Sequence, residues 1–262
     1  MNRLQQLFND KKENLLNVYF TAGFPQLEDT TRILSLLEKS GADLVEIGMP
    51  YSDPMADGPV IQESNGVALA NGMSIKKLFA QLEGIREKVS VPILLMGYLN
   101  PVMQYGIENF LKKAAEVGVD GIIVPDLPMQ EYEDEYKGLF EKYGLSNVFL
   151  VTPQTSPGRM KKVDSLTNGF VYVVSTNSTT GNETKKEDTT TEYFERIKAA
   201  ELKNATLIGF NIKDNASFSN ACKYANGAII GSAFIKVLEK GGELEKSIPE
   251  FVQGVKGITV CN

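Results

Sequence analysis

Eight short apolar runs recur along the chain, and the intervals between them leave room for a helix in each gap. Each run is apolar almost throughout, which is typical of strands that are covered on both faces in an all-parallel sheet. This pattern favours an α/β fold. The strands are predicted at Leu16–Phe20, Leu44–Gly48, Pro92–Met96, Gly121–Val124, Val148–Val151, Phe170–Val174, Thr206–Gly209 and Gly227–Gly231.

Amphipathic segments lie between the runs, and several carry helix start and stop signals. Glu28–Ser40 and Asn109–Val117 have apolar residues at helical spacing, and each is followed by a glycine. Ser156 is expected to cap a helix that has Pro157 in its first turn. Ser232 is likewise expected to cap the helix after the last strand.

Eight strand–helix units in 262 residues predict one closed barrel, because such a barrel needs about 250 residues. The open alternative, a doubly wound sheet, needs a glycine-rich phosphate turn after its first strand. The segment 21–25, Thr-Ala-Gly-Phe-Pro, is no such turn. No linker divides the chain, so we expect residues 1–262 to form a single (β/α)8 TIM barrel domain with a short N-terminal helix.

A weak internal repeat supports this fold. Residues 41–48 and 118–124 each combine a glycine, an aspartate and an apolar strand, and residues 225–231 are a looser copy with Asn226. Shared chemistry of the loops that lead into strands explains the repeat as well as common ancestry does.

Composition excludes several classes of function. The chain has no histidine, which removes imidazole bases, Ser-His-Asp and Cys-His catalysis and histidine-ligated zinc, so acid–base work falls to Asp, Glu, Lys or Tyr. A net charge of −6 argues against nucleic acid and anionic membranes as partners. No apolar stretch reaches membrane-spanning length, no signal peptide is evident, and Cys222 and Cys261 indicate no disulfide framework, so a cytoplasmic location is expected.

Glu46 interrupts an otherwise apolar strand. Burying a carboxylate without a partner costs several kcal/mol, roughly, so the residue needs a partner or a task. Alternation predicts that Leu44, Glu46 and Gly48 face the barrel interior while Val45 and Ile47 face the helices. Burial should raise the pKa of Glu46 and make it a usable acid or base near neutral pH. A buried ion pair is the structural alternative.

Two long loops follow strands at the end of the barrel where such enzymes place their sites. The first, from Pro50 to Pro59, holds Asp57 among prolines and a glycine, which suits a preorganised residue, although an Asp in such a loop can simply form a turn. The second, from Ser175 to about Thr190, is polar and is either a mobile lid or a tolerated insertion.

The last two strands are expected to hold a phosphate group. They end in Gly209-Phe210-Asn211 and Gly231-Ser232, and the second leads straight into a helix, whose N-terminus attracts anions. A plain helix cap is the alternative. Only Lys213 lies near a strand end, which weakens a Schiff-base aldolase mechanism, and no acidic cluster has metal-binding spacing.

These residues resemble the α chain of tryptophan synthase over nearly the whole length. The specific segment is residues 44–59, Leu-Val-Glu-Ile-Gly-Met-Pro-Tyr-Ser-Asp-Pro-Met-Ala-Asp-Gly-Pro; residues 96–101, 126–128 and 227–232 also match. The resemblance implies cleavage of indole-3-glycerol phosphate to indole and glyceraldehyde 3-phosphate. It implies Glu46 as the general acid–base and Asp57 as its partner near the indole N–H.

The resemblance also implies substrate-binding roles. Tyr172 matches an active-site tyrosine and Tyr98 an aromatic position beside the indole. Thr180 and Gly181 match the Thr-Gly of the lid, and Gly181, Gly231 and Ser232 match phosphate contacts. The chain departs from the family at Asn211, where the Gly-Phe-Gly phosphate turn has its second glycine, and at Thr176 and Ser178, where the lid often has Arg and Gly. Asn tolerates the left-handed conformation better than most residues.

A partner is implied as well: a β chain that holds pyridoxal phosphate, with Asp53–Pro54 in the contact and an α2β2 heterotetramer as the assembly. No cofactor is expected in this chain and no metal. Three alternatives stay open: a stand-alone lyase that releases indole, an isomerase on another phosphate-binding barrel, and a catalytically silent barrel that regulates a β chain.

Overall fold

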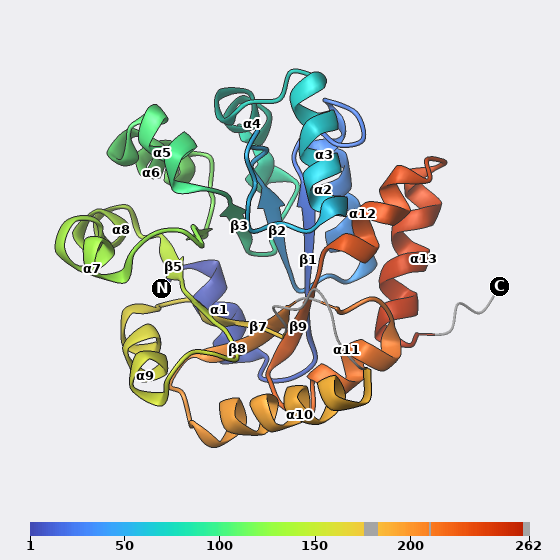
Figure 1. The fold of residues 1–262 in the computed structure, drawn as a ribbon. Helices are drawn as coiled ribbons and strands as arrows, with labels where there is room; N and C mark the ends of the chain where they lie inside the picture. The colour runs from blue at the N-terminus through green and yellow to red at the C-terminus, as the bar shows by residue number, and fades with distance from the viewer. Residues whose placement is uncertain (176–182, 210, 259–262) are drawn as a thin grey trace.

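A ring of parallel strands forms the centre of the molecule, and helices surround it (Figure 1). The computed structural model describes residues 1–175, 183–209 and 211–258, and for 183–189 it describes the backbone alone. The strands are β1 (Leu15–Thr21), β2 (Leu44–Gly48), β3 (Ile93–Met96), β4 (Gly121–Ile123), β5 (Ser146–Val148), β6 (Leu150–Val151), β7 (Phe170–Val174), β8 (Ala205–Gly209) and β9 (Gly227–Ile230).

The nine strand segments amount to eight strands of a closed barrel. The hydrogen-bonded order runs from β5 through β4, β3, β2, β1, β9, β8 and β7 to β6. Only Phe149 separates β5 from β6, and its carbonyl accepts a hydrogen bond of 3.0 Å from the Tyr172 N–H on β7. β5 and β6 are therefore one strand that joins the two ends of the order. The predicted (β/α)8 TIM barrel with a short N-terminal helix is confirmed.

Helices connect the strands on the outside. They are α1 (Arg3–Asp10), α2 (Asp29–Ser40), α3 (Pro59–Ala70), α4 (Ile75–Leu82), the 3₁₀ turn η1 (Ile85–Glu87), α5 (Leu99–Tyr105), α6 (Ile107–Glu116), α7 (Met129–Glu131), the π-helical turn η2 (Tyr132–Tyr136), α8 (Lys137–Tyr143), α9 (Pro157–Leu166), α10 (Glu183–Ala199), α11 (Asn215–Ala221), α12 (Ser232–Glu239) and α13 (Leu244–Lys256). No helix in the described ranges is both long and apolar enough to cross a bilayer.

Most helix boundaries agree with the predicted signals. The Ser156 hydroxyl accepts from the Arg159 N–H at 3.3 Å, and Pro157 is the first residue of α9, as expected. The prediction that Ser232 caps α12 is wrong: Gly231 is the N-cap residue and Ser232 is already inside the helix. The Ser232 side chain is exposed.

Side chains alternate between two cores along each strand. Val45 and Ile47 pack in the core between strands and helices, whereas Leu44 packs in a second core inside the barrel. Glu46 and Gly48 share the parity of Leu44, so they face the interior, as the alternation predicted.

Helix α1 closes the N-terminal end of the barrel. Its buried residues Leu4 and Phe8 belong to the interior core, and the ring of Phe8 lies 5.9 Å from that of Phe170 on β7. The amide of Asn2 caps this helix and also donates to the Asp120 carbonyl at 2.8 Å. Helix α1 thus fills the interior core at the N-terminal ends of the strands, and a functional site is expected at their C-terminal ends.

The internal repeat has a structural counterpart at this same end. An Asp or Asn lies one or two positions before every second strand of the ring. It makes two hydrogen bonds to one residue of the barrel strand that comes before it in the chain. Its N–H donates to a carbonyl there, and its side-chain oxygen accepts from the N–H of the same residue. The four pairs are Asp43 with Leu16, Asp120 with Ile93, Asn168 with Asn147 and Asn226 with Thr206.

Candidate active site

Glu46 lies fully buried in β2, with its side chain inside the barrel. Its Oε1 accepts a hydrogen bond of 2.5 Å from the Asn17 amide on β1. Its Oε2 has no hydrogen-bond partner among the described residues. One carboxylate oxygen is therefore held by the protein, and the other is left for a different partner.

Burial changes the acidity of this carboxyl group. Loss of solvent raises the pKa of Glu46 from 4.5 to about 8, and the Asn17 hydrogen bond opposes the rise. The burial effect is the larger because one amide N–H replaces only part of the water shell of a carboxylate. At neutral pH the group is mostly protonated, so it can donate a proton and then act as a base.

Asp57 lies half-buried in the loop between β2 and α3. It contacts an aromatic side chain that follows the next strand, β3. The Tyr98 hydroxyl, just after β3, donates to Asp57 Oδ2 at 3.1 Å and accepts from the Ala56 N–H at 3.0 Å. Burial raises the pKa of Asp57 to about 6, and the bond from Tyr98 lowers it in part. Asp57 is therefore mostly ionised at pH 7, the opposite state from Glu46.

Two tyrosines face the carboxylates from the barrel wall. Tyr19 on β1 is the register neighbour of Glu46, and its hydroxyl occupies the space that a Cβ on Gly48 would need. Tyr172 on β7 crosses Gly209 in the same way, at 2.5 Å. Glycine is required at both strand ends because a ring passes over each.

The charges of Glu46 and Asp57 affect the acidity of both hydroxyl groups, those of Tyr19 and Tyr172. The pKa of Tyr172 is raised by burial first and then by Glu46, Tyr19 and Asp57. The pKa of Tyr19 is raised by burial first and then by Asp57 and Glu46. Both tyrosines keep their protons at physiological pH and can donate hydrogen bonds into the site.

The ends of β8 and β9 form the third side of the site. Gly231 precedes α12 directly, and the ring of Tyr19 packs against it, with Cδ1 3.3 Å from the position of a Cβ. Ser232 is the first residue of α12, so its N–H is among the helix N–H groups without a partner in the helix. Asn211 after β8 adopts a φ of 59°, a left-handed conformation that usually favours glycine.

The structure brings Glu46, Asp57, Tyr98 and Tyr172 to one end of the barrel, with Asn211, Gly231 and Ser232 at its rim. Thr180, Gly181 and Phe210 lie outside the described residues, as do Thr176 and Ser178 of the expected lid. Within the described part of the chain, no group of three or more Cys, Asp or Glu side chains could hold a metal ion.

Asn17 and Tyr19 also line the site, and neither was predicted as a site residue. Both occupy inward positions of β1, in the run Leu-Leu-Asn-Val-Tyr-Phe-Thr from residue 15. The signal was available: Asn17 is a polar residue in an apolar strand, the argument that identified Glu46. Its relevance depends on the register between β1 and β2, which pairs Asn17 with Leu44 and Tyr19 with Glu46.

Comparison with known proteins agrees with this geometry. The family model described as tryptophan synthase alpha chain matches residues 4–257. A tryptophan synthase alpha chain from Flavobacterium johnsoniae is 54% identical over 98% of this chain and 100% of its own length. The tryptophan synthase subunit alpha of Legionella pneumophila, a solved structure, superposes with a TM-score of 0.86 at 32% identity, covering 98% of both chains. A chain of the tryptophan synthase complex of Pyrococcus furiosus superposes at 0.84 and 34% identity, covering 95% of this chain and 100% of that one.

Proposed function

The chain belongs to the tryptophan synthase alpha chain family, and from this premise we propose that its Glu46 and Asp57 carry the lyase reaction of tryptophan biosynthesis. That reaction is the retro-aldol cleavage of indole-3-glycerol phosphate to indole and glyceraldehyde 3-phosphate. The observation that supports the assignment is the buried Glu46, whose pKa burial raises to about 8 and whose Oε2 has no partner among the described residues.

The first step is protonation of the indole ring. Glu46 in its neutral form gives its proton to C3 of the indole, and positive charge develops on the ring nitrogen. Asp57, ionised at pH 7, stabilises this charge from beside the ring N–H. The two carboxyl groups divide the work because their environments hold them in different protonation states.

The second step breaks the carbon–carbon bond. Glu46, now a carboxylate, removes the proton of the side-chain hydroxyl nearest the ring. The bond between C3 and that carbon breaks, its electron pair returns to the ring, and the hydroxyl carbon becomes the aldehyde. Glu46 ends as it began, so one residue serves as acid and base, and none of these steps requires a cofactor in this chain.

The rest of the site positions the substrate. Tyr98 holds Asp57, and Tyr172 presents a protonated hydroxyl to the interior. The phosphate lies at Gly231 and Ser232 on the N-terminus of α12 and at Phe210-Asn211, where the left-handed Asn211 supplies the turn that glycine supplies elsewhere in the family. Thr180 and Gly181, which lie outside the described residues, are assigned to substrate binding by the family resemblance alone.

The chain works with a partner in this proposal. A β chain holding pyridoxal phosphate binds at the loop that contains Asp53 and Pro54, and the assembly is an α2β2 heterotetramer in the cytoplasm. Support comes from the exposed Met55 in this loop, 90% accessible, and from a superposable chain that belongs to a tryptophan synthase complex. Residues 1–262 act as one barrel domain.

The experiment is indole formation from indole-3-glycerol phosphate by the purified chain, alone and with a β chain. Glu46→Gln is compared with Glu245→Gln, a matched change at an exposed glutamate of the outer helix α13 that pairs with Arg32. We expect slow cleavage alone, faster cleavage with the β chain, and a loss of at least about 100-fold in Glu46→Gln only. Fast cleavage alone would indicate a stand-alone lyase. No indole under any condition would contradict the lyase assignment.

A further inference from the structure

Asn17 is the side chain that the protein places against Glu46. It lies on β1 with no exposed surface, and its amide Nδ2 donates to Glu46 Oε1 at 2.5 Å. The register pairs Tyr19 with Glu46 and Asn17 with Leu44, so two inward residues of β1, one level with Glu46 and one two positions earlier, lie on the strand next to the carboxyl group. The inward residue before them, Leu15, is apolar and completes the interior core.

A side-chain amide at this position destabilises the fold, because part of it is buried without a hydrogen bond. Asn17 Oδ1 is buried and has no hydrogen-bond partner among the described residues. A leucine would fill the interior without leaving a polar atom unsatisfied, and buried polar atoms are otherwise nearly always paired. The retention of an amide here is explained by its one bond, the N–H donated to Glu46.

We propose that Asn17 is the positioning residue of Glu46, and that by holding Oε1 it directs the exchanging proton to Oε2, the oxygen that faces the substrate. This inference rests on the proposed function of Glu46. A proton on Oε1 would meet the amide hydrogen, so the neutral acid carries its proton on Oε2 and uses Oε1 as a carbonyl acceptor. The same N–H then stabilises the carboxylate that forms when the proton leaves.

The other groups around Glu46 do not take over this task. Tyr19 on β1 and Tyr172 on β7 are the titratable neighbours, and burial together with the Glu46 charge holds the pKa of each hydroxyl above its usual value. The register neighbour on β3 is Leu94, which is apolar. Among the described residues, Asn17 is the one group whose contact shifts the acidity of Glu46 toward the charged form.

Loss of the amide therefore has a defined direction. Removing a donor that favours the carboxylate raises the pKa of Glu46 further above 8. The carboxylate formed after ring protonation becomes less stable, so kcat falls. The amide does not bind the substrate, so KM changes little.

The test follows the carboxyl group directly. The infrared C=O band of protonated Glu46, assigned by its absence in Glu46→Gln, is titrated in the wild-type chain and in Asn17→Leu. Asn147→Leu is the matched control, since Asn147 is a similarly buried asparagine in β5 whose amide nitrogen also lacks a partner in the described part of the chain, and its strand parity points it toward the helices. Asn17→Val replaces Asn17→Leu if the larger side chain prevents folding.

We expect the pKa of Glu46 to rise by about one pH unit in Asn17→Leu and to stay unchanged in Asn147→Leu. In indole formation we expect kcat to fall about tenfold with KM within about twofold. An unchanged or lower pKa of Glu46 would overturn the proposal. If the wild-type chain makes no indole, the proposed function fails, while the infrared titration still decides whether Asn17 holds Glu46.

Discussion

Two carboxylates, those of Asp120 and Glu46, are buried at opposite ends of the barrel, and they differ in how many partners compensate their charge. Asp120, just before β4 at the N-terminal end, is 2% exposed, and both of its oxygens have partners. Oδ1 accepts from Arg3 at 3.2 Å, and Oδ2 accepts from the Arg86 guanidinium and from the Ile93 N–H at 3.0 Å. Glu46 is fully buried and accepts one hydrogen bond, from the side-chain amide of Asn17.

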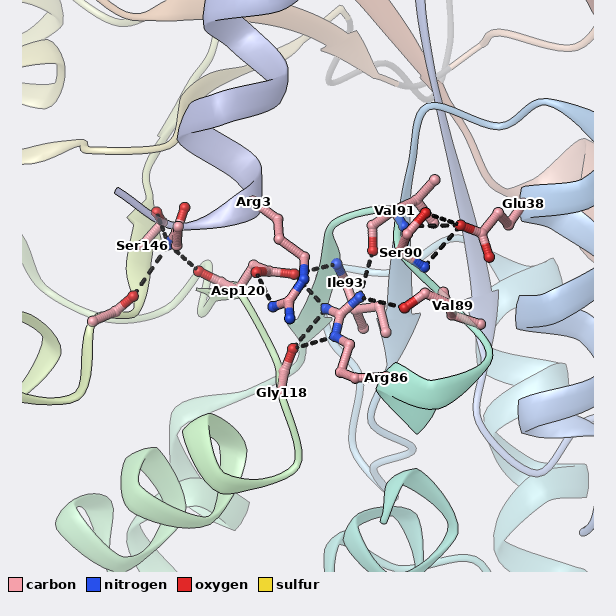
Figure 2. Close-up of polar contacts among 12 residues, drawn as sticks. Arg3, Glu38, Arg86, Val89, Ser90, Val91, Ile93, Gly118, Asp120 and Ser146 are labelled. Carbon is pink, nitrogen blue, oxygen red and sulfur yellow. Dashed lines mark hydrogen bonds and ion pairs between the residues drawn. The ribbon is translucent and has the colours of Figure 1, made fainter. Parts of the chain in front are cut away.

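The residues around Asp120 also have hydrogen-bond partners of their own (Figure 2). The Arg86 guanidinium also donates to the carbonyls of Gly118 and Val91, at 2.6–2.8 Å. Nearby, Glu38 at the end of α2 accepts from the Ser90 N–H at 2.8 Å and from the Val91 N–H at 3.1 Å. These contacts tie α1, α2 and the loops before β3 and β4 together.

The difference shows how one fold divides stability from function. A buried carboxylate with two guanidinium groups and a backbone N–H offsets its lost hydration and joins elements that are distant in sequence. A buried carboxylate with one donor does not offset it, and the uncompensated cost appears as the raised pKa of Glu46.

Replacement of Glu46 by glutamine is expected to stabilise the fold as it removes activity. The pKa of Glu46 is about 8 in the folded chain against 4.5 as a reference, so folding favours the proton, and stability falls as the pH rises from 4.5 to 8. A neutral glutamine avoids this loss. The gain should be small near pH 5 and about 4 to 5 kcal/mol above pH 8, measured by urea unfolding. A gain that does not change with pH would contradict the account.

Replacement of Asp120 by alanine is expected to do the reverse. It leaves the Arg86 guanidinium, only 16% exposed, without its carboxylate, a change that costs about 3 to 5 kcal/mol. Urea unfolding at pH 7 measures the loss. The pH dependence of indole formation should not change, because Asp120 lies at the far end of the barrel; a shift in that profile would break the division between the two ends.

Replacement of Tyr98 by phenylalanine is expected to move one limb of the pH profile. In the wild-type chain kcat/KM should rise through about pH 6, as Asp57 ionises, and fall through about pH 8, as Glu46 loses its proton. The Tyr98 hydroxyl favours ionised Asp57, so its removal should raise the lower limb by up to about one pH unit. The upper limb should stay in place, and movement of both limbs would refute separate roles.

Replacement of Arg3 by leucine is expected to have the smallest effect. The Arg3 side chain is 47% exposed, and Asp120 keeps Arg86 and the Ile93 N–H. Exposed ion pairs contribute about 0.2 to 1 kcal/mol, so unfolding in urea should show a loss in that range. A loss as large as that of Asp120→Ala would mean that Arg3, and not Arg86, compensates the buried charge.

The barrel itself could be predicted from sequence because its signals are local. β2 and β7 begin and end at the predicted residues, and the other strands differ at their ends by a residue or two. The alternation in Leu44–Gly48 was enough to turn Glu46 inward, since side chains of a strand point to opposite faces. The left-handed Asn211 agrees with the tolerance expected of asparagine. Ser232 shows the limit of such signals, because a serine and a glycine are both acceptable caps.

The partners of the buried carboxylates were decided by the tertiary structure. Asn17 and Glu46 are 29 positions apart, and Arg3 and Asp120 are 117 apart, so their contacts depend on strand register and on how α1 enters the barrel. Closure of the ring depends equally on long-range contacts, the pairing of Leu150 and Val151 with β7 and the bond from the Tyr172 N–H to the Phe149 carbonyl. Periodicity acts over a few residues and determines which face a side chain takes. Which side chain it meets, and hence its acidity, depends on the closed barrel, because burial and neighbours set a pKa.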